Sequence, residues 1–204
     1  MDSTNLIILY IASSYLVGSI SGSLLLGRIW NIDIRKVGSG NAGGTNALRS
    51  VGVTFGLLTF FIDLTKGILP TYLVNGNETL MLICGFSAML GHVYPIFYNF
   101  KGGKGAGTLL GVLIIVLPSS VPYIILIWLI SVVLTGYVGL STILAIFTFL
   151  VYSFLYASLQ KTIFSFIAFL FIIFTHRENI KRMKRGTENQ FKKVMIFTTN
   201  KKGS

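Results

Sequence analysis

Two glycine-rich stretches contain most of the side chains that could carry out chemistry. Residues 38–44 read GSGNAGG and are followed by Arg49, and residues 101–108 read KGGKGAGT and include Lys104. Glycine leaves backbone N–H groups free to converge on an anion, and a nearby Arg or Lys adds a full positive charge. Two such stretches, each with a cation, predict a site for two phosphate-like groups. The alternative is that these glycines only allow tight turns and close helix packing.

Neither stretch fits a nucleotide-binding motif in its proper context. Residues 38–43 match G-x-G-x-x-G, but that pattern indicates dinucleotide binding only between a strand and a helix, and here it follows a predicted membrane helix. The phosphate-loop pattern G-x-x-x-x-G-K-[ST] fails, because Gly44 or Thr108 stands at the lysine position. The glycines therefore indicate anion binding without a nucleotide-binding fold.

Carboxylates are scarce near these stretches. Asp33, Asp63 and Glu178 are isolated in the sequence, so a pair of carboxylates for acid–base catalysis or a Mg²⁺ site has little support. Asp63 and Lys66 lie three residues apart in an apolar segment, where an internal ion pair would lower the cost of placing two charges in a membrane. We expect that ion pair.

The histidines and the cysteine do not form a metal site by sequence. His92 and His176 are the two histidines, and Cys84 is the single cysteine, so a disulfide within the chain or a multi-thiolate site is excluded. We expect no metal and no cofactor. His92 is expected to be structural. His176 stands at the end of a predicted membrane helix, where it is either an exposed interfacial residue or part of a site.

The composition predicts the elements that must position these groups. Hydrophobic residues make up 53% of the 204 residues and charged residues 11%, whereas an ordinary soluble domain has about a quarter charged residues. This excludes a soluble globular enzyme and predicts an all-α integral membrane protein, one polytopic domain over residues 1–204. The seven expected transmembrane helices lie near 5–27, 52–75, 79–98, 106–119, 121–136, 139–157 and 161–175. The main alternative fuses 106–119 and 121–136 into one bent or re-entrant element.

The positive charges predict the orientation, because Lys and Arg accumulate in cytoplasmic loops. More than half of the Lys and Arg residues lie in residues 177–204, a basic segment expected in the cytoplasm. With the N-terminus outside, Lys161 alone faces outward and both glycine stretches face the cytoplasm with the cluster at 176–179, so one pocket could hold all three. The basic segment is expected to meet anionic lipid, and no nucleic acid partner is expected.

The three polar blocks together resemble the signature blocks of the bacterial acyl-phosphate:glycerol-3-phosphate acyltransferases (the PlsY type). The blocks are residues 38–49 (GSGNAGGTNALR), residues 91–95 (GHVYP) with 100–105 (FKGGKG), and residues 176–180 (HRENI). They occur in the order and spacing of that family, and the resemblance runs the length of the chain.

This resemblance implies an inner-membrane enzyme with its active site facing the cytoplasm. Such an enzyme moves a fatty acyl group from acyl phosphate to the 1-hydroxyl of glycerol 3-phosphate, giving lysophosphatidate and phosphate, and membrane lipid surrounds it. The implied catalytic residues are Ser39, Arg49, Lys104, His176 and Asn179. The implied substrate-binding residues are Gly38, Gly40, Asn41, Gly43, Thr45, Asn46, Gly102, Gly103 and Gly105.

The chemistry of an acyl phosphate suits a site with few carboxylates. The leaving group is already a stable anion, so no strong general acid is needed, and cations and loop amides would offset the repulsion between two phosphates. The acyltransferase motif HxxxxD is absent, because Phe97 and Lys181 stand five residues after the histidines. The acceptor proton goes either to His176 or to the donor phosphate. We favour the donor phosphate and assign His176 to binding the acceptor.

A transporter for a phosphate-bearing solute is the alternative function. Such proteins also place cations and glycine loops near helix ends, but they usually contain internal repeats with matching broken helices at the membrane midplane. The block at 38–49 has no second copy in the sequence. We therefore prefer the acyltransferase.

Overall fold

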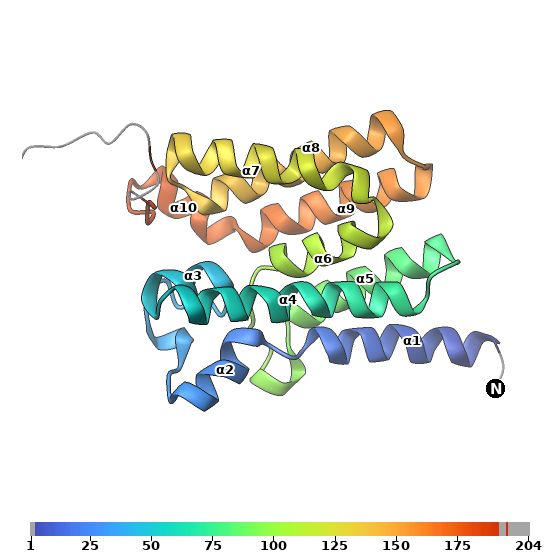
Figure 1. The fold of residues 1–204 in the computed structure, drawn as a ribbon, viewed down its shortest axis with the longest axis horizontal. Coiled ribbons are helices and arrows are strands. Elements are labelled where there is room, and N and C mark those ends of the chain that lie inside the picture. The colour runs from blue at the N-terminus through green and yellow to red at the C-terminus, as the bar shows by residue number, and fades with distance from the viewer. Residues whose placement is uncertain (1–2, 192–194, 196–204) are drawn as a thin grey trace, which may run out of the picture. The chain divides into compact units, whose positions relative to one another are not determined.

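The computed structural model describes residues 3–191 and residue 195, and these residues form helices and loops without a β strand. The chain divides into two compact units, Met1–Pro118 and Ser119–Ser204, each built from helices (Figure 1). The prediction of an all-α protein is confirmed for the described residues. The expectation of one domain over 1–204 stays a prediction.

The first unit is organised around one long helix, α4. Its elements are α1 (Ser3–Gly18), α2 (Gly22–Trp30), the 3₁₀ turn η1 (Ile34–Lys36), α3 (Gly44–Ser50), α4 (Val53–Leu73), α5 (Glu78–Val93), the 3₁₀ turn η2 (Ile96–Tyr98) and α6 (Ala106–Val116). Helix α4 packs against α2, α3, α5 and α6, and α1 packs against α5 and α4. Figure 1 shows α1 and α4 as two long helices of this unit.

Glycines allow the helices of the first unit to approach closely. A Cβ atom on Gly18 or Gly91 would overlap the backbone of the facing helix, between α1 and α5. Gly67 and Gly111 do the same between α4 and α6. Without a hydrophobic driving force inside a bilayer, such close backbone contact is a main source of helix association. Glycine at position 18 therefore allows α1 to pack directly against α5.

The helix expected at 5–27 is broken, which corrects that prediction. Helix α1 ends at Gly18, α2 begins at Gly22, and the two are bent by 42°. Buried polar side chains make the break tolerable: Nζ of Lys66 donates to the carbonyl oxygen of Ile20 at 3.0 Å, and the N–H of Gly22 donates to Oδ1 of Asp63 at 3.4 Å. Backbone groups freed in an apolar environment need such partners.

Asp63 and Lys66 form the expected internal ion pair. Nζ of Lys66 lies 2.9 Å from Oδ1 of Asp63, and each side chain is 4% exposed. Burying two charges is costly unless each finds additional hydrogen-bond partners. The backbone groups at the α1–α2 break supply those partners.

The polar segment at 28–50 contains a helix that the sequence analysis did not predict. Helix α3 occupies Gly44–Ser50, and its Ala47 is fully buried in a cluster with Ile34, Ala42 and Phe55. A Cβ atom on Gly56 of α4 would overlap Leu48, so α3 lies directly on α4. Burial of one apolar side of this short helix, rather than intrinsic propensity, explains why it forms.

The second unit is built around α8. Its helices are α7 (Val121–Thr135), α8 (Val138–Tyr156), α9 (Leu159–Thr175) and α10 (Arg177–Lys184), and the 3₁₀ turn η3 (Pro118–Ser120) leads into α7. Helix α8 packs against the other three. The chain leaves α-helical geometry between Val116 and Val121, where the sequence has Pro118, and Pro122 follows in the first turn of α7. Residues 192–194 and 196–204 of the predicted basic segment lie outside the described residues.

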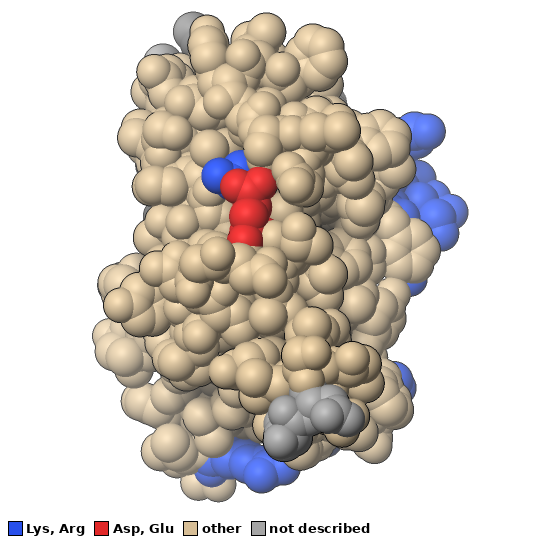
Figure 2. All heavy atoms as spheres, turned by 90° about the vertical axis from the view of Figure 1, so that its right-hand side faces the viewer, with Lys and Arg blue, Asp and Glu red and all other residues tan. Residues whose placement is uncertain are grey.

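Several helices are long and apolar enough to cross a membrane. Four qualify alone, and the count reaches six if the bent pairs α1–α2 and α9–α10 each form one span. Helix α6, with 11 residues, is shorter. Large apolar side chains are exposed on many of these helices, and charged side chains are sparse on the face at which α1 begins (Figure 2). Seven spans and the orientation of the termini stay predictions.

Candidate active site

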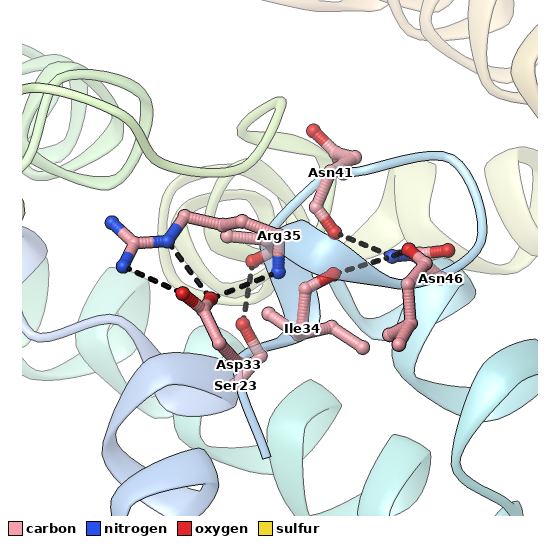
Figure 3. Close-up of polar contacts among 8 residues, drawn as sticks. Ser23, Asp33, Ile34, Arg35, Asn41 and Asn46 are labelled. Atoms are coloured by element: carbon pink, nitrogen blue, oxygen red, sulfur yellow. Dashed lines mark hydrogen bonds and ion pairs between the residues drawn. The ribbon is translucent and has the colours of Figure 1, made fainter.

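The first glycine stretch is held by the side chain of Asn46, which is buried in α3. Its Oδ1 accepts a hydrogen bond from the N–H of Ser39 at 2.9 Å. Its Nδ2 lies 3.1 and 3.1 Å from the carbonyl oxygens of Ile34 and Asn41 (Figure 3) and 3.0 Å from that of Val37. One amide therefore ties η1 and both ends of residues 37–41 together. These contacts are structural, and the expected role of Asn46 in substrate binding stays a prediction.

The glycines of this stretch fit tightly around that amide. Gly38 has φ of +59°, a conformation that residues with a side chain rarely adopt, and a Cβ atom there would overlap Oδ1 of Asn46 and Oγ of Ser50. The Oγ of Ser23 on α2 donates to the carbonyl oxygen of Ala42 at 2.9 Å. The loop is therefore fixed from α2 and from α3, which leaves Ser39 exposed at its surface.

An ion pair lies beside this loop. Oδ1 of Asp33 accepts hydrogen bonds from the backbone N–H and from Nε of Arg35 at 3.1 and 3.0 Å, as Figure 3 shows. The side-chain hydrogen bond from Arg35 holds the pKa of the Asp33 carboxyl below its ordinary value. The Asp33 carboxylate is therefore a weaker base than an unpaired carboxylate.

The second glycine stretch is attached to the end of α5. The N–H groups of Gly102 and Gly103 donate to the carbonyl oxygens of Val93 and His92, each at 3.2 Å. Gly105 has φ of +89° and caps α6, which begins at Ala106. Lys104, half-buried, therefore lies immediately before a helix N-terminus, where the first N–H groups lack helical partners and the dipole favours an anion.

The two stretches lie next to the same side chain of α4. Ideal Cβ positions on Gly44 and on Gly107 lie 3.7 Å from Cβ and 3.8 Å from Cδ2 of Phe60, respectively. The start of α3 and the first turn of α6 therefore flank one residue. Arg49 in the last turn of α3 and Thr45 in its first turn are both half-buried. Within the first unit, one end of each block therefore lies beside α4, and the predicted roles of the residues in these blocks stay predictions.

In the second unit, His176 is buried at the junction of α9 and α10. Its Nδ1 lies 2.8 Å from the carbonyl oxygen of Ile172, which can only accept a hydrogen bond, so Nδ1 carries the proton. In the neutral ring, Nε2 is then the hydrogen-bond acceptor. The interpretation of His176 as an exposed interfacial residue is wrong, because only 4% of the residue is exposed.

Asn179, in the first turn of α10, is held by Glu188. Its Nδ2 donates to Oε1 of Glu188 at 2.7 Å, and Oε2 of Glu188 accepts from Nε of Arg182 at 2.6 Å. A Cβ atom on Gly139 of α8 would lie 2.9 Å from Nδ2 of Asn179. Glycine at 139 therefore allows α8 to pack directly against the asparagine.

Two of these positioning residues were missed by the sequence analysis. Glu188 was assigned to a basic tail, although it follows the turn at Gly186 and its side chain is 4% exposed. A lone acidic residue soon after a basic helix is the signal that could have identified it. Gly139 gave no signal beyond being a glycine inside an apolar helix.

His92 was expected to be structural, and it is buried beside the ion pair of α4. Its Nδ1 lies 3.4 Å from Oδ1 of Asp63, and both side chains are 4% exposed. Across the described residues, no three His, Cys, Asp or Glu side chains group as metal ligands would.

Comparisons with known proteins identify the family. The sequence model of glycerol-3-phosphate acyltransferase matches residues 8–186. The chain is 41% identical over 193 residues to a glycerol-3-phosphate acyltransferase of Geotalea daltonii, covering 91% of this chain and 98% of the relative. It is 39% identical over 187 residues to the enzyme of that name from Finegoldia magna, covering 88% and 93%.

The solved structures agree with the sequence comparison. A crystal structure of PlsY, described as an integral membrane glycerol 3-phosphate acyltransferase in its glycerol 3-phosphate form, matches with a TM-score of 0.86 at 34% identity, covering 91% of this chain and 95% of that one. The lysophosphatidic acid form of the same protein matches with a TM-score of 0.82. With its glycine stretches, His176 and Asn179 held as described, this chain belongs to the glycerol-3-phosphate acyltransferase family.

Proposed function

We propose that this protein transfers a fatty acyl group from an acyl phosphate to the 1-hydroxyl of glycerol 3-phosphate, which yields lysophosphatidate and inorganic phosphate. Family membership supports the acceptor and the transfer. The neighbour solved in a lysophosphatidic acid form supports the product. The choice of donor depends on the acidic side chains of this chain.

The observation that carries the donor assignment is that four acidic side chains of the described residues are already paired with cations. Asp33 pairs with Arg35, Asp63 with Lys66, Glu178 with Lys181, and Glu188 with Arg182, at 3.0, 2.9, 2.9 and 2.6 Å. A carboxylate committed to a cation is a poor general base or acid. A donor whose leaving group is a stable phosphate anion needs neither, so it suits this set of side chains.

We assign binding and charge stabilisation to the residues of the three blocks. Arg49 and Lys104 offset the repulsion between the two phosphates and stabilise the charge that develops on the transferred group. Ser39, His176 and Asn179 contact the acceptor and the reacting centre. The remaining predicted residues (Gly38, Gly40, Asn41, Gly43, Thr45, Asn46, Gly102, Gly103 and Gly105) shape the two loops and provide main-chain donors.

The acceptor proton passes to the phosphate of the donor in this mechanism. The hydroxyl oxygen attacks the acyl carbon, the bond from that carbon to the phosphate oxygen breaks, and the released phosphate carries the proton. His176, with Nδ1 protonated, can accept at Nε2 a hydrogen bond from the other hydroxyl of glycerol 3-phosphate and so orient the acceptor. No cofactor takes part.

We further propose seven spans, with the N-terminus outside and the glycine stretches on the cytoplasmic side of the bacterial inner membrane. The positive-inside distribution supports this orientation. Helix α6, about 16 Å long at 1.5 Å per residue, is shorter than the hydrocarbon core, but it packs against α4 and α5, which shield its ends.

A donor comparison tests the function. Purified full-length protein in detergent is given glycerol 3-phosphate with palmitoyl phosphate or palmitoyl-coenzyme A. The proposal predicts lysophosphatidate and phosphate in equal amounts from palmitoyl phosphate and no product from the thioester. Product from the thioester alone would overturn the donor assignment.

A further inference from the structure

The charged cluster of Asp63, Lys66 and His92 lies outside the residues assigned to the reaction. Each of these side chains is 4% exposed, although α4 and α5 lie among the segments able to cross a membrane. Ionisable groups at such positions are costly and usually functional. The ion pair already supports the α1–α2 break, which explains in part why Asp63 and Lys66 are buried there. It does not explain why His92 is buried beside them.

His92 connects this cluster to the second glycine stretch. On one side of its ring, Nδ1 lies 3.4 Å from Oδ1 of Asp63. On the other side, Nε2 lies where a Cβ atom of residue 103 would be, so the ring packs on the bare backbone of Gly103. The carbonyl oxygen of His92 also accepts the N–H of Gly103 at 3.2 Å. Ring and backbone of one residue thus hold the loop just before Lys104.

Asp63 also borders the start of α6, which follows the loop. Its Cβ lies 3.5 Å from the ideal Cβ position of Gly107. His92 therefore packs on the middle of the 101–105 loop, and Asp63 lies beside the first turn of α6, which directly follows it. A shift of either side chain would be transmitted to Lys104, because packed groups without voids pass on displacements.

We propose that Asp63 and His92 are positioning residues that set the geometry of the 101–105 loop and, through it, of Lys104. This inference rests on the proposed function of Lys104. Asp63 and His92 act on the reaction through the loop and not by touching the substrates. Asp63 orients the imidazole of His92, and the imidazole holds Gly103 in place. This role differs from that of buried apolar residues such as Leu82, which lies on α5 with His92 and serves in packing.

A steric exchange between residues 92 and 103 tests the contact. Gly103→Ala places a methyl group on Nε2 of His92, so it should lower kcat/KM with palmitoyl phosphate and glycerol 3-phosphate by about 10- to 100-fold. His92→Ala removes the ring, so the double variant should regain about tenfold over Gly103→Ala alone. Gly102→Ala is the matched control: its Cβ overlaps the main-chain oxygen of His92, which every residue at 92 keeps, so His92→Ala should not relieve it.

A second cycle tests the link to Lys104. His92→Ala and Asp63→Asn should each lower kcat/KM about tenfold or more in the wild-type protein and much less in the Lys104→Ala background, because the group they position is gone. Leu82→Ala, a buried truncation on α5, should lower the thermal unfolding midpoint yet leave kcat/KM near the wild-type value. Equal losses in both backgrounds, or no relief of Gly103→Ala, would overturn the proposal.

Further controls separate a loss of positioning from a failure to fold. If His92→Ala does not fold, His92→Asn replaces it, since its amide reaches toward Asp63 but stops short of Gly103. Trypsin cleavage after Lys101 should be faster in the His92 variant than in Leu82→Ala, and unchanged cleavage would also count against the proposal. Wild-type turnover in the same preparation reports on the proposed function itself, so its failure is distinguishable from failure of the positioning role.

Discussion

The amide of Asn179 donates a hydrogen bond to Glu188, nine residues later, with 2.7 Å between Nδ2 and Oε1. Glu188 in turn accepts from Nε of Arg182 at 2.6 Å. The contact orients the asparagine amide so that Nδ2 faces Glu188. Residues after α10 therefore complete the block that begins at His176.

Replacing Glu188 tests this arrangement. Glu188→Ala should lower the free energy of unfolding by about 1–3 kcal/mol, because it leaves the buried Nδ2 of Asn179 without its acceptor. It should also lower kcat, since Asn179 loses its orientation. Glu178→Ala is the control, because Glu178 is 54% exposed in its pair with Lys181, and exposed ion pairs contribute little. Similar losses in the two variants would contradict the assignment.

Asn46 should be among the most sensitive positions of the first glycine stretch. Asn46→Asp keeps the shape but replaces the donor that faces three carbonyl oxygens with an acceptor, so unfolding should become easier by about 1–3 kcal/mol and activity should fall. Ser50→Ala removes only one hydrogen bond to Oδ1 of Asn46, at 3.2 Å, and should cost about 0.5–1.5 kcal/mol. Thermal unfolding of both variants checks the order, and a larger effect at Ser50 would be inconsistent with it.

Arg49 and Lys104 should stabilise the transition state of the reaction more than they stabilise the folded protein. Arg49→Ala and Lys104→Ala should each lose about 2–4 kcal/mol of transition-state stabilisation, measured from kcat/KM, if they act like other electrostatic stabilisers. Lys101→Ala provides the matched control, because Lys101 is an exposed lysine in the same loop. Near-normal turnover in both test variants would eliminate the site for two anions.

His176→Ala distinguishes the two destinations of the acceptor proton. If the donor phosphate takes the proton, the variant should mainly raise KM for glycerol 3-phosphate and retain measurable kcat. The pH dependence of its kcat should match that of the wild type. Complete loss of turnover with unchanged binding of both substrates would instead make His176 the base.

The sequence predicted the helix positions well where apolar runs are bounded by polar residues. The ranges 139–157 and 161–175 differ from α8 and α9 by at most two residues at either end. The break in 5–27 was not predictable, because it depends on Lys66 and Asp63, which lie about forty residues later and satisfy the exposed backbone groups. Helix α3 was missed for a related reason, since tertiary burial of Ala47 stabilises it.

In the candidate site, too, local sequence features could be predicted and long-range contacts could not. Residue types and spacing drew attention to the blocks that contain Lys104, His176 and Asn179, because glycine loops with cations and a polar block at a helix end are uncommon in an apolar chain, and the roles of these residues stay predictions from the family resemblance. The supporting contacts of Glu188 and Gly139 were not predictable, since both depend on how α8 and α10 pack. Local sequence reveals reactive groups more readily than the long-range contacts that orient them.

The most direct test of the central claim measures both products of one reaction. Wild-type protein and Lys104→Ala are incubated with palmitoyl phosphate and radiolabelled glycerol 3-phosphate, and lysophosphatidate and phosphate are counted together. The account predicts equal amounts of the two from the wild type and a loss of about 30- to 1000-fold in Lys104→Ala. Phosphate release without acylated glycerol 3-phosphate, or equal product from both proteins, would contradict it.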